Sequence, residues 1–405
     1  MDICLNSFLN PSGLSYVGQS YFKCFVQNRI RVIPVWLGPP EALESLDKNI
    51  VEEMLLASQL PTENAPLQFH AGRADDMKLL KHRSAVVGSI VLEGNRLLPQ
   101  HLHICKQLDL VFVPSYFCRN VCVSSGVPKN RVCYLPYPLD SNRWNTTVQP
   151  KKPSDGIFRF LYLNTCYERK GWDVLLRAFW EEFSADEPVE LVIKSYREED
   201  RTEPLDILVA LEAAKLGVDR EKRAKITIVD EVLSAEALPS FMKSCDAFVS
   251  PHRSEGFGLN IWHAMAIGLP VICTNYGGNT DFAKPETSWL VGVSEMKAPS
   301  EAEIKVFPHY RGIIWAEPDR MDLRRQMRSC MLNPVEAKRR AEVASGLVHM
   351  NYSHNRTFDL FATAMKTHLP KIFEQICVSK HIEELIKQPT ERFSSTSVPL
   401  TLLEI

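Results

Sequence analysis

The stretch SEGFGLNIWHAMAIGLPVI, residues 254–272, contains two side chains capable of binding or acid–base chemistry in an otherwise apolar segment. Glu255 precedes His263 by eight positions, and the residues between them are mainly glycine and large apolar side chains. A carboxylate in such surroundings is costly unless a partner offsets its desolvation. Because Glu255 lies among small residues at the start of a predicted helix, we expect it to face a ligand.

Two further segments indicate phosphate binding. In NTCYERKGWD, residues 164–173, Arg169 and Lys170 stand beside a glycine just before a predicted helix. The free amides and the dipole at a helix start favour an anion, and two cations strengthen that preference. In NYGGNTDF, residues 275–282, Gly277 and Gly278 follow a predicted strand, where their amides can meet phosphate oxygens.

The first half of the chain carries polar residues at the ends of predicted strands. His70 ends the run LQFH, and Glu93 and Asn95 follow the run AVVGSIVL. Gly13 follows the first strand, where it could allow the backbone to approach a ligand, although a lone glycine is also typical of a simple turn. A single His or Glu at a strand end is often structural, so both interpretations stay open; together these residues predict a polar cleft floor.

Alternating strands and helices must position these residues. Short apolar runs predict buried parallel strands at 2–8, 30–37, 65–70, 85–93, 108–115, 158–164, 189–196, 224–230 and 269–275, and residues 238–251 predict a helix followed by a strand. After the first strand we expect a loop over 9–18 and then a helix over 19–28. The alternation predicts two successive doubly wound α/β domains, in which ligands bind at the carboxyl ends of the strands.

The predicted domains are separated by a segment rich in Pro, Ser, Asn and Asp at about 135–157, which is typical of a linker. We expect an N-terminal domain over 1–145 and a C-terminal domain over 146–350. Helices then follow over 351–380, and a flexible tail over 381–405.

Composition excludes some classes of function. The 405 residues carry 47 basic and 49 acidic side chains, so a net charge of −2 gives no general attraction to nucleic acid. No signal peptide and no apolar run of ~18 to 20 residues is visible, which predicts a cytoplasmic protein without a transmembrane segment; peripheral membrane contact stays open. The eleven cysteines include no CxxC pair, so we expect buried free thiols rather than metal ligands or disulfides.

Four motifs, in this order, resemble those of the family 4 retaining glycosyltransferases, which have the GT-B fold. They are residues 109–140 (DLVFVPSYFCRN and onward), 160–179 (FLYLNTCYERKGWDVLLRAF), 250–278 (SPHRSEGFGLNIWHAMAIG and onward) and 315–327 (WAEPDRMDLRRQM). The likeness covers nearly all of residues 80–365. It implies two Rossmann-like domains facing across a cleft, with the last helix, at about 352–375, crossing back to the N-domain.

The resemblance also implies roles for individual residues. Lys170 and Arg169 would bind the donor diphosphate, and Glu255 would be the first acid of an E-x7-E signature that hydrogen-bonds the transferred sugar. His70, Glu93 and Asn95 would lie on the acceptor side. The rest of the nucleotide-sugar site would comprise Gly13, Asp230, Glu231, Gly256, Phe257, Gly258, His263, Gly277 and Gly278.

The implied function is transfer of a hexose from a UDP- or GDP-linked sugar to an acceptor hydroxyl on a glycan, lipid or protein. The anomeric configuration would be retained by a front-face mechanism that needs neither a metal nor another cofactor. Two departures from the family pattern bear on this. Thr165 replaces a common Arg, and His263 replaces the second glutamate, so a neutral imidazole stands where a carboxylate would accept two bonds from a ribose diol.

Other functions therefore stay open. A chain with a degenerate donor site could be a non-catalytic binding or scaffold protein of the same fold. A nucleotide-sugar epimerase or a phosphorylase is also compatible with the fold, although no lysine site for a phosphorylase cofactor is visible in the sequence.

Overall fold

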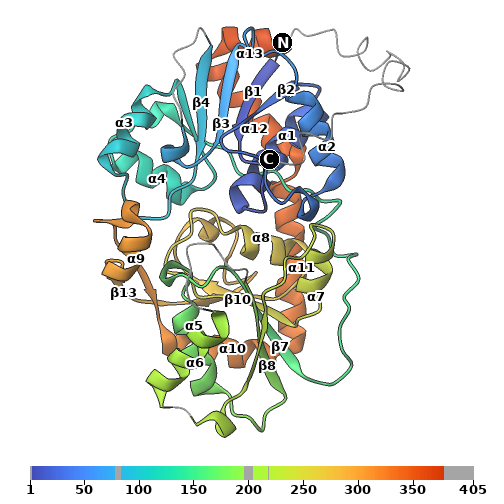
Figure 1. The fold of residues 1–405 in the computed structure, drawn as a ribbon, viewed down its shortest axis with the longest axis vertical. Coiled ribbons are helices and arrows are strands. Elements are labelled where there is room, and N and C mark those ends of the chain that lie inside the picture. The colour runs from blue at the N-terminus through green and yellow to red at the C-terminus, as the bar shows by residue number, and fades with distance from the viewer. Residues whose placement is uncertain (1, 78–83, 196–203, 218, 378–405) are drawn as a thin grey trace.

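The structure is a computed structural model that describes residues 2–77, 84–195, 204–217 and 219–377 (Figure 1). The predicted tail over 381–405 lies outside these residues. Two six-stranded parallel sheets, each packed against helices, form two α/β domains one above the other. The predicted succession of two doubly wound domains is confirmed.

The N-domain sheet has the strand order β2-β1-β3-β4-β5-β6, and every neighbouring pair is parallel. Strands β1, β3 and β5 are buried along their whole length because helices cover both faces of the sheet. The strands are β1 Asp2–Ser7, β2 Arg31–Trp36, β3 Leu67–Gly72, β4 Ala85–Ile90, β5 Leu110–Val113 and β6 Val132–Tyr134. The helices between them are α1 Gly13–Gln27, α2 Lys48–Ala57, α3 Pro99–Gln107 and α4 Tyr116–Ser124.

The first helix begins earlier than the sequence pattern predicts. The expected loop over 9–18 is wrong from residue 13 onward, because α1 starts at Gly13. The Ser12 side chain accepts a hydrogen bond from the Ser15 amide, and the Asn10 side chain accepts one from the Ser12 amide. These two caps compensate for the glycine and serine content that favoured a loop.

The C-domain sheet has the order β12-β11-β10-β7-β8-β9. Its strands are β7 Phe158–Leu163, β8 Val189–Lys194, β9 Lys225–Val229, β10 Ala247–Ser250, β11 Val271–Thr274 and β12 Trp289–Val291. A separate antiparallel pair, β13 Val293–Lys297 and β14 Trp315–Pro318, encloses the short helix α9 Glu301–Val306. The other helices are α5 Trp172–Glu182, α6 Leu205–Leu216, α7 Ala237–Lys243, α8 Leu259–Ala266, α10 Arg320–Leu332 and α11 Pro334–Asn351.

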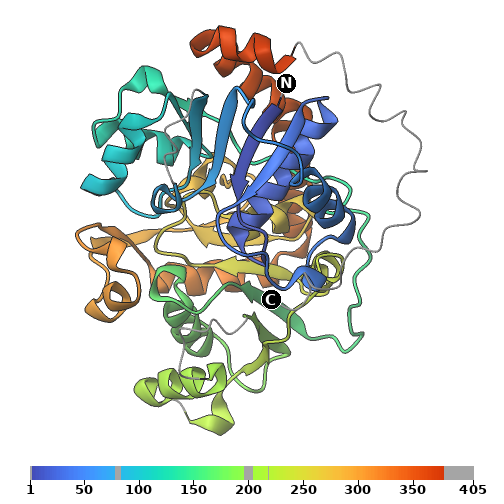
Figure 2. The same ribbon diagram turned by 45° about the horizontal axis from the view of Figure 1, so that its top comes forward.

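The chain returns to the N-domain after α11. Helix α12, His354–His368, packs on α1, and α13, Pro370–Cys377, packs on α12. Phe361 of α12 reaches the N-domain core, where its ring lies 4.8 Å from that of Phe25 and 5.8 Å from that of Phe112. In Figures 1 and 2 these helices, coloured red, therefore lie with the blue elements of the N-domain.

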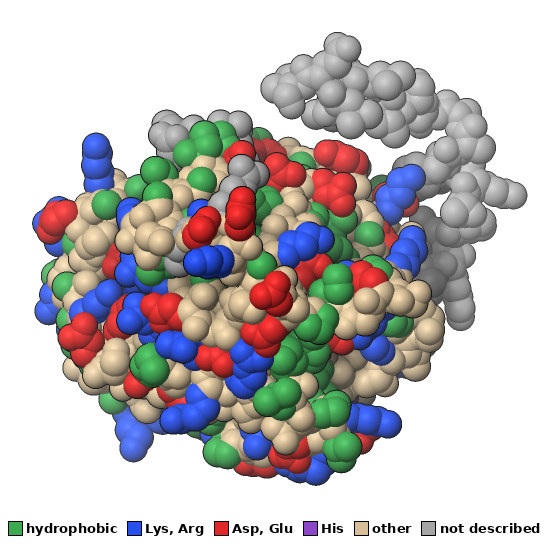
Figure 3. Space-filling model, turned by 90° about the horizontal axis from the view of Figure 1, so that it is seen from below, with side chains coloured by type: hydrophobic (Ala, Val, Ile, Leu, Met, Phe, Trp, Pro, Cys, Tyr) green, Lys and Arg blue, Asp and Glu red, His purple; other side chains and the backbone are tan. Residues whose placement is uncertain are grey.

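The distribution of charged side chains on the surface agrees with the nearly equal numbers of acidic and basic residues in the sequence. Seen from below, acidic and basic side chains are interspersed over the face of the molecule (Figure 3). The eleven cysteines all lie in the described part of the chain as free thiols, and nine of them are buried, as predicted. None of the helices in that part combines the length and the apolarity needed to cross a bilayer.

A candidate active site in the interdomain cleft

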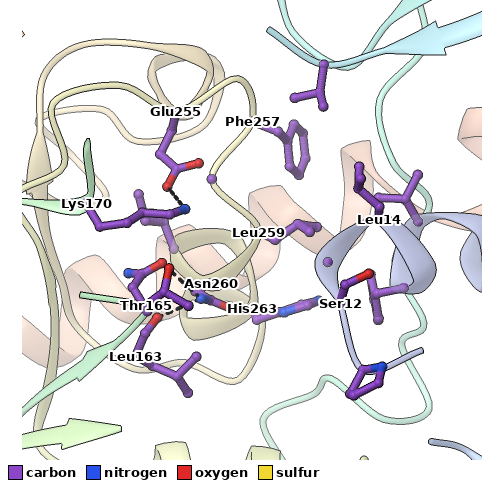
Figure 4. A pocket seen from close by; sticks show the side chains of 18 of the residues that line it. Ser12, Leu14, Leu163, Thr165, Lys170, Glu255, Phe257, Leu259, Asn260 and His263 are labelled. Carbon is purple, nitrogen blue, oxygen red and sulfur yellow. Dashed lines mark hydrogen bonds and ion pairs between the residues drawn. The ribbon is translucent and has the colours of Figure 1, made fainter. Parts of the chain in front are cut away.

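A cleft of about 540 Å³ lies between the two domains. The loops that follow β1 and β4 line it from the N-domain, and the loops that follow β7 and β10 line it from the C-domain. The carboxyl ends of four parallel strands therefore converge on one space, which is where open α/β sheets bind ligands. Figure 4 shows the side chains of Lys170, Glu255 and His263 on the C-domain side of this space.

Lys170 reaches the cleft from the loop between β7 and α5, whose residues Glu168–Lys170 form one turn of 3₁₀ helix. Gly171 ends this turn with a φ of +71°, and a Cβ at this position would lie 1.8 Å from the carbonyl oxygen of Pro251. Only glycine fits such a close backbone approach. The loop after β7 is thus pressed against the loop after β10, which carries Glu255.

Glu255 is 8% exposed and forms an ion pair with Lys170, drawn as a dashed line in Figure 4. Arg169 adds a second cation, with Nη1 3.6 Å from Oε2 of the same carboxylate. Burial opposes ionisation of Glu255, but the charges of Lys170 and Arg169 outweigh it and lower its pKa to about 2. Glu255 is therefore a fixed anion that accepts hydrogen bonds and cannot supply a proton near neutral pH.

Arg169 links the two domains. Its Nη2 lies 2.7 Å from Oε1 of Glu93 in the N-domain, and its Nη1 donates to the carbonyl oxygen of Ser254 at 2.9 Å. Burial alone would lower the pKa of this guanidinium, but the neighbouring Glu93 and Glu255 carboxylates raise it. Tyr310 donates a hydrogen bond to the other oxygen of Glu93 at 2.7 Å. The buried guanidinium of Arg169 is thus paired with two carboxylates and one carbonyl oxygen, so Arg169 holds its position without a ligand.

Two helix starts meet at the cleft. Helix α1 begins at Gly13, where a Cβ would lie 3.2 Å from Leu259, the first residue of α8. Gly258 precedes α8 with a φ of +92°. The next residue of α8, Asn260, donates to the carbonyl oxygen of Leu163 at 2.6 Å, which ties the helix to the end of β7 (Figure 4). Gly13, Gly258 and Leu259 all line the cleft, so the N-terminal ends of both helices lie at its wall, an arrangement that suits an anion.

His263 lies one turn further along α8 in an aromatic group. Its ring stacks on Trp144 of the interdomain linker with centroids 3.8 Å apart. The ring of Tyr16 of α1 lies nearly perpendicular to the imidazole, with centroids 4.7 Å apart. Burial, with a smaller contribution from Arg143, lowers the pKa of His263 well below its usual 6.5, so the imidazole is neutral. Its Nε2 has no hydrogen-bond partner among the described residues.

Comparison with known proteins agrees with this arrangement. Residues 158–306, which include the phosphate loop and Glu255, match the family described as Glycosyl transferases group 1. A curated relative is the lipopolysaccharide core biosynthesis mannosyltransferase LpsB of Rhizobium meliloti, 33% identical over 89 residues, which are 20% of this chain and 25% of LpsB. The matches to curated relatives span a quarter to a third of those proteins' own length.

Similarity of fold extends over the whole described molecule. Sucrose-phosphate synthase from Thermosynechococcus elongatus superposes with a TM-score of 0.65 and 15% identity over 92% of this chain and 100% of that one. Anabaena Alr3699/HepE in complex with UDP-glucose superposes with a TM-score of 0.64 and 14% identity over 91% of this chain and 100% of that one. The GT-B fold that the sequence motifs imply, with its last helix on the N-domain, is confirmed.

The structure gathers about half of the predicted site residues at the cleft of this glycosyltransferase fold. The predicted residues that line it are Gly13, Glu93, Arg169, Lys170, Glu255, Phe257, Gly258 and His263. The predicted residues that lie outside the lining, as far as the described chain shows, are His70, Asn95, Asp230, Glu231, Gly256, Gly277 and Gly278.

The three glycines outside the lining hold loops together. Gly256 lies against the N-domain, where its carbonyl oxygen accepts from Oγ of Ser115 at 2.7 Å. The amide of Gly278 donates to the carbonyl oxygen of Glu255 at 2.7 Å. A Cβ on Gly277 would lie 2.6 Å from that same oxygen. These contacts fix the backbone beneath Glu255.

Of the other predicted residues outside the lining, two are bonded within the protein and two are exposed. His70 is buried inside β3, which continues to Gly72 instead of ending at the histidine; its Nε2 lies 3.5 Å from the Asn6 side chain, and burial lowers its pKa to about 4. Asn95 accepts a hydrogen bond from the amide of Ile314 in the C-domain at 2.8 Å. Asp230 and Glu231 are exposed after β9, and it is the next residue, Val232, that reaches the cleft.

Sequence reasoning missed several residues that line the cleft. Lys194 is buried at the carboxyl end of β8, where burial lowers its pKa. A lysine that ends an apolar strand could have been noticed in VELVIK. Tyr310, Asn260 and Trp144 carry no such signal, because their partners are distant in the sequence or are backbone atoms.

Proposed function

We propose that this chain is a glycosyltransferase that moves a hexose from a UDP- or GDP-linked sugar to an acceptor hydroxyl, with retention of the anomeric configuration and without a metal. One observation carries the proposal. A buried carboxylate with a pKa of about 2, Glu255, is paired with Lys170 at the wall of a cleft onto which two helix starts converge. Such a site combines a cation for a diphosphate with an anion for sugar hydroxyls.

In this mechanism, Lys170 and the amides at the start of α8 would stabilise the charge that develops on the leaving diphosphate. Glu255 would accept hydrogen bonds from hydroxyls of the transferred sugar and orient its anomeric carbon. The bond from that carbon to the diphosphate oxygen breaks as the bond to the acceptor oxygen forms on the same face. The acceptor proton passes to the departing phosphate oxygen, so the protein need not supply a nucleophile.

Two findings on similar proteins guide the choice of donor. The Anabaena structure contains UDP-glucose, which supports UDP-sugars as the first donors to test. The name of LpsB supports the inclusion of a mannose-linked donor.

A panel of UDP- and GDP-sugars tests the proposal. We expect the cognate nucleotide to raise the melting temperature and its sugar donor to be slowly hydrolysed to the α or β anomer that the donor itself carries. Lys170→Met should weaken nucleotide binding by about 10- to 100-fold, as the loss of a charged contact does. The matched control is Lys338→Met, since Lys338 is an exposed residue of α11. If no nucleotide stabilises the protein, the enzyme assignment is wrong.

One observation favours a second candidate, a non-catalytic binding protein of the same fold. His263 is neutral and one face of its ring is covered by Trp144, so the predicted ribose contact has no charge and reduced access. His263→Glu separates the two functions. Tighter nucleotide binding in the variant, with no donor hydrolysis by the natural chain, supports the binding protein; weaker binding identifies the imidazole as a working contact of the enzyme.

A further inference from the structure

A segment of the C-domain reaches across to the N-domain. We call residues 298–314 the strap; they join β13 to β14 and contain α9 and a 3₁₀ turn at Pro308–Tyr310. In Figure 1 the strap, in orange, extends from the C-domain toward the part of the N-domain that carries α3 and α4. Its contacts involve both the phosphate loop and the acceptor side of the cleft.

The strap holds the backbone of the phosphate loop. The carboxylate of Glu303, which is 6% exposed, accepts from the amide of Glu168 at 3.1 Å and from the amide of Arg169 at 3.3 Å. In return, the carboxylate of Glu168 accepts from the amide of Ser300 at 3.1 Å. These reciprocal bonds order the two residues that immediately precede Lys170.

The strap also docks on the N-domain. Tyr310 donates to Oε2 of Glu93 at 2.7 Å. Next to this bond, Gly94 leaves room for Ile313, since a Cβ on Gly94 would lie 2.8 Å from Ile313 Cδ1. Leu98 of the N-domain packs in one apolar cluster with strap residues Ile304, Tyr310 and Ile313, together with Trp315. The strap is therefore held by both polar and apolar contacts across the domain boundary.

Glu93 joins the two sets of contacts. One of its oxygens accepts from Tyr310, while the other lies 2.7 Å from Nη2 of Arg169, the residue whose amide Glu303 holds. Arg169 in turn lies beside Glu255, the partner of Lys170. A continuous path of hydrogen bonds and ion pairs thus runs from the docked strap to the residues that face the cleft.

We propose that Glu303 and Tyr310 are positioning residues for the donor diphosphate site. The strap orders the phosphate loop, and with it Lys170, when it is docked on the N-domain. Donor affinity is thereby coupled to closure of the two domains, although neither residue needs to touch the diphosphate. The coupling to donor affinity rests on the proposed function; the ordering of the loop does not.

The test uses the full chain with Glu303→Ala, Glu303→Gln and Tyr310→Phe. The control is Tyr116→Phe, which removes a hydroxyl from an exposed tyrosine of α4 that stacks on Tyr134. Hydrogen exchange of the peptide covering residues 166–171 is measured without ligand, and the Kd of UDP and GDP is measured by calorimetry. Donor hydrolysis gives kcat and KM separately.

We expect faster exchange in this peptide and a Kd raised by about 10-fold or more in Glu303→Ala and Tyr310→Phe, as for the loss of a hydrogen bond to a charged group. Glu303→Gln retains an acceptor oxygen and should recover part of the affinity. KM should rise more than kcat falls. Faster exchange with an unchanged Kd, or equal effects in Tyr116→Phe, would overturn the proposal.

The two proposals can fail separately. If the natural chain binds no nucleotide, the proposed function and the coupling to donor affinity are both wrong. Hydrogen exchange of the peptide 166–171 then tests the claim that the strap orders the phosphate loop. Faster exchange only in the strap variants supports that claim, and unchanged exchange overturns it as well.

Discussion

Glu255 remains ionised in a nearly water-free position because two cations lie against it. A buried carboxylate without partners would bind a proton, and its pKa would rise. Lys170 and Arg169 reverse that tendency and hold the pKa at about 2. The carboxylate is therefore ionised throughout the neutral pH range, which suits a group that orients hydroxyls.

Glu255→Gln tests this electrostatic balance through stability. Because the pKa of Glu255 is lower in the folded chain than its usual 4.5, ionisation stabilises the fold above about pH 4.5, and this stabilisation is lost as the pH falls toward 2. The full shift corresponds to roughly 3 kcal/mol. Denaturant unfolding should show natural chain and variant differing most near pH 7 and converging in acid.

Glu336→Gln is the matched control. Its pKa is also lowered to about 2, by Arg339 and Arg340, but this ion-pair group lies at the surface of α11, where the Glu336 side chain is 36% exposed. Water and salt screen such pairs, so the variant should differ little from the natural chain, and less still in high salt. Equal pH dependence of the two variants would show that burial does not set the energetics of Glu255.

For single residues, the sequence predicts a place in the site when the residue belongs to a short local motif. Lys170 precedes a helix by two positions and Glu255 lies in a glycine-rich turn, so both are recognisable from short motifs. Glu93 is predicted as a polar residue of the cleft, but its bond to Tyr310 joins positions 217 residues apart. No periodicity reports such a contact, because it depends on how the two domains meet.

The phosphate loop depends on a backbone contact at Gly171. Gly171→Ala would combine a left-handed φ with a Cβ 1.8 Å from the carbonyl oxygen of Pro251. Gly156→Ala places an alanine at a similar φ of +73° in open space. We expect about 1 to 2 kcal/mol of destabilisation at Gly156 and about 4 kcal/mol or more at Gly171. Thermal unfolding measures both, and similar losses would contradict the close approach.

Elements are predicted well where the hydrophobic pattern is strong. Each of the ten segments in which the sequence predicts a strand overlaps a strand of the structure. The start of α1 is missed because Gly13 and two serines are typical of loops, whereas side-chain caps at Asn10 and Ser12 allow a helix. The strap is not predicted for another reason. Contacts with the other domain order it, and its own hydrophobic pattern does not.

At the scale of the molecule, the domains meet through close backbone packing. A Cβ on Gly256 would lie 2.4 Å from Val91 Cγ2 and 2.5 Å from the carbonyl oxygen of Leu92, both in the N-domain. On another part of the boundary, the amide of Ala235 donates to the carbonyl oxygen of Ser45 at 3.0 Å. The described structure is therefore a closed arrangement of the two domains.

Gly256→Ala should force this arrangement apart. We expect a larger radius of gyration by small-angle X-ray scattering and weaker nucleotide binding, with a cost of about 1 to 3 kcal/mol typical of overpacking. Gly346→Ala is the control, since Gly346 lies in α11 with open space around it. That change should stabilise the helix by about 0.5 to 1 kcal/mol and leave the scattering unaltered. An unchanged radius for Gly256→Ala would contradict the tight contact.

The overall architecture follows from the alternation of strands and helices, but the relation between the domains does not. Each sheet is specified by its own apolar runs and by the rule that ligands bind at strand ends. The pairing of Glu93 with Arg169 and the stacking of Trp144 on His263 require the domains to be placed in space. The sequence therefore indicates which loops face the cleft, and the structure adds which side chains are paired within it.

The chain passes between the domains twice, first in the linker and then between α11 and α12. The two passages are bonded to each other where the amide of Leu139 donates to the carbonyl oxygen of Tyr352 at 2.6 Å. If the domains opened, this place would act as a pivot, and displacement would grow with distance from it. The strap lies on the opposite side of the molecule from α11 (Figure 1), so opening would separate the strap from Glu93 first and admit a ligand from that side.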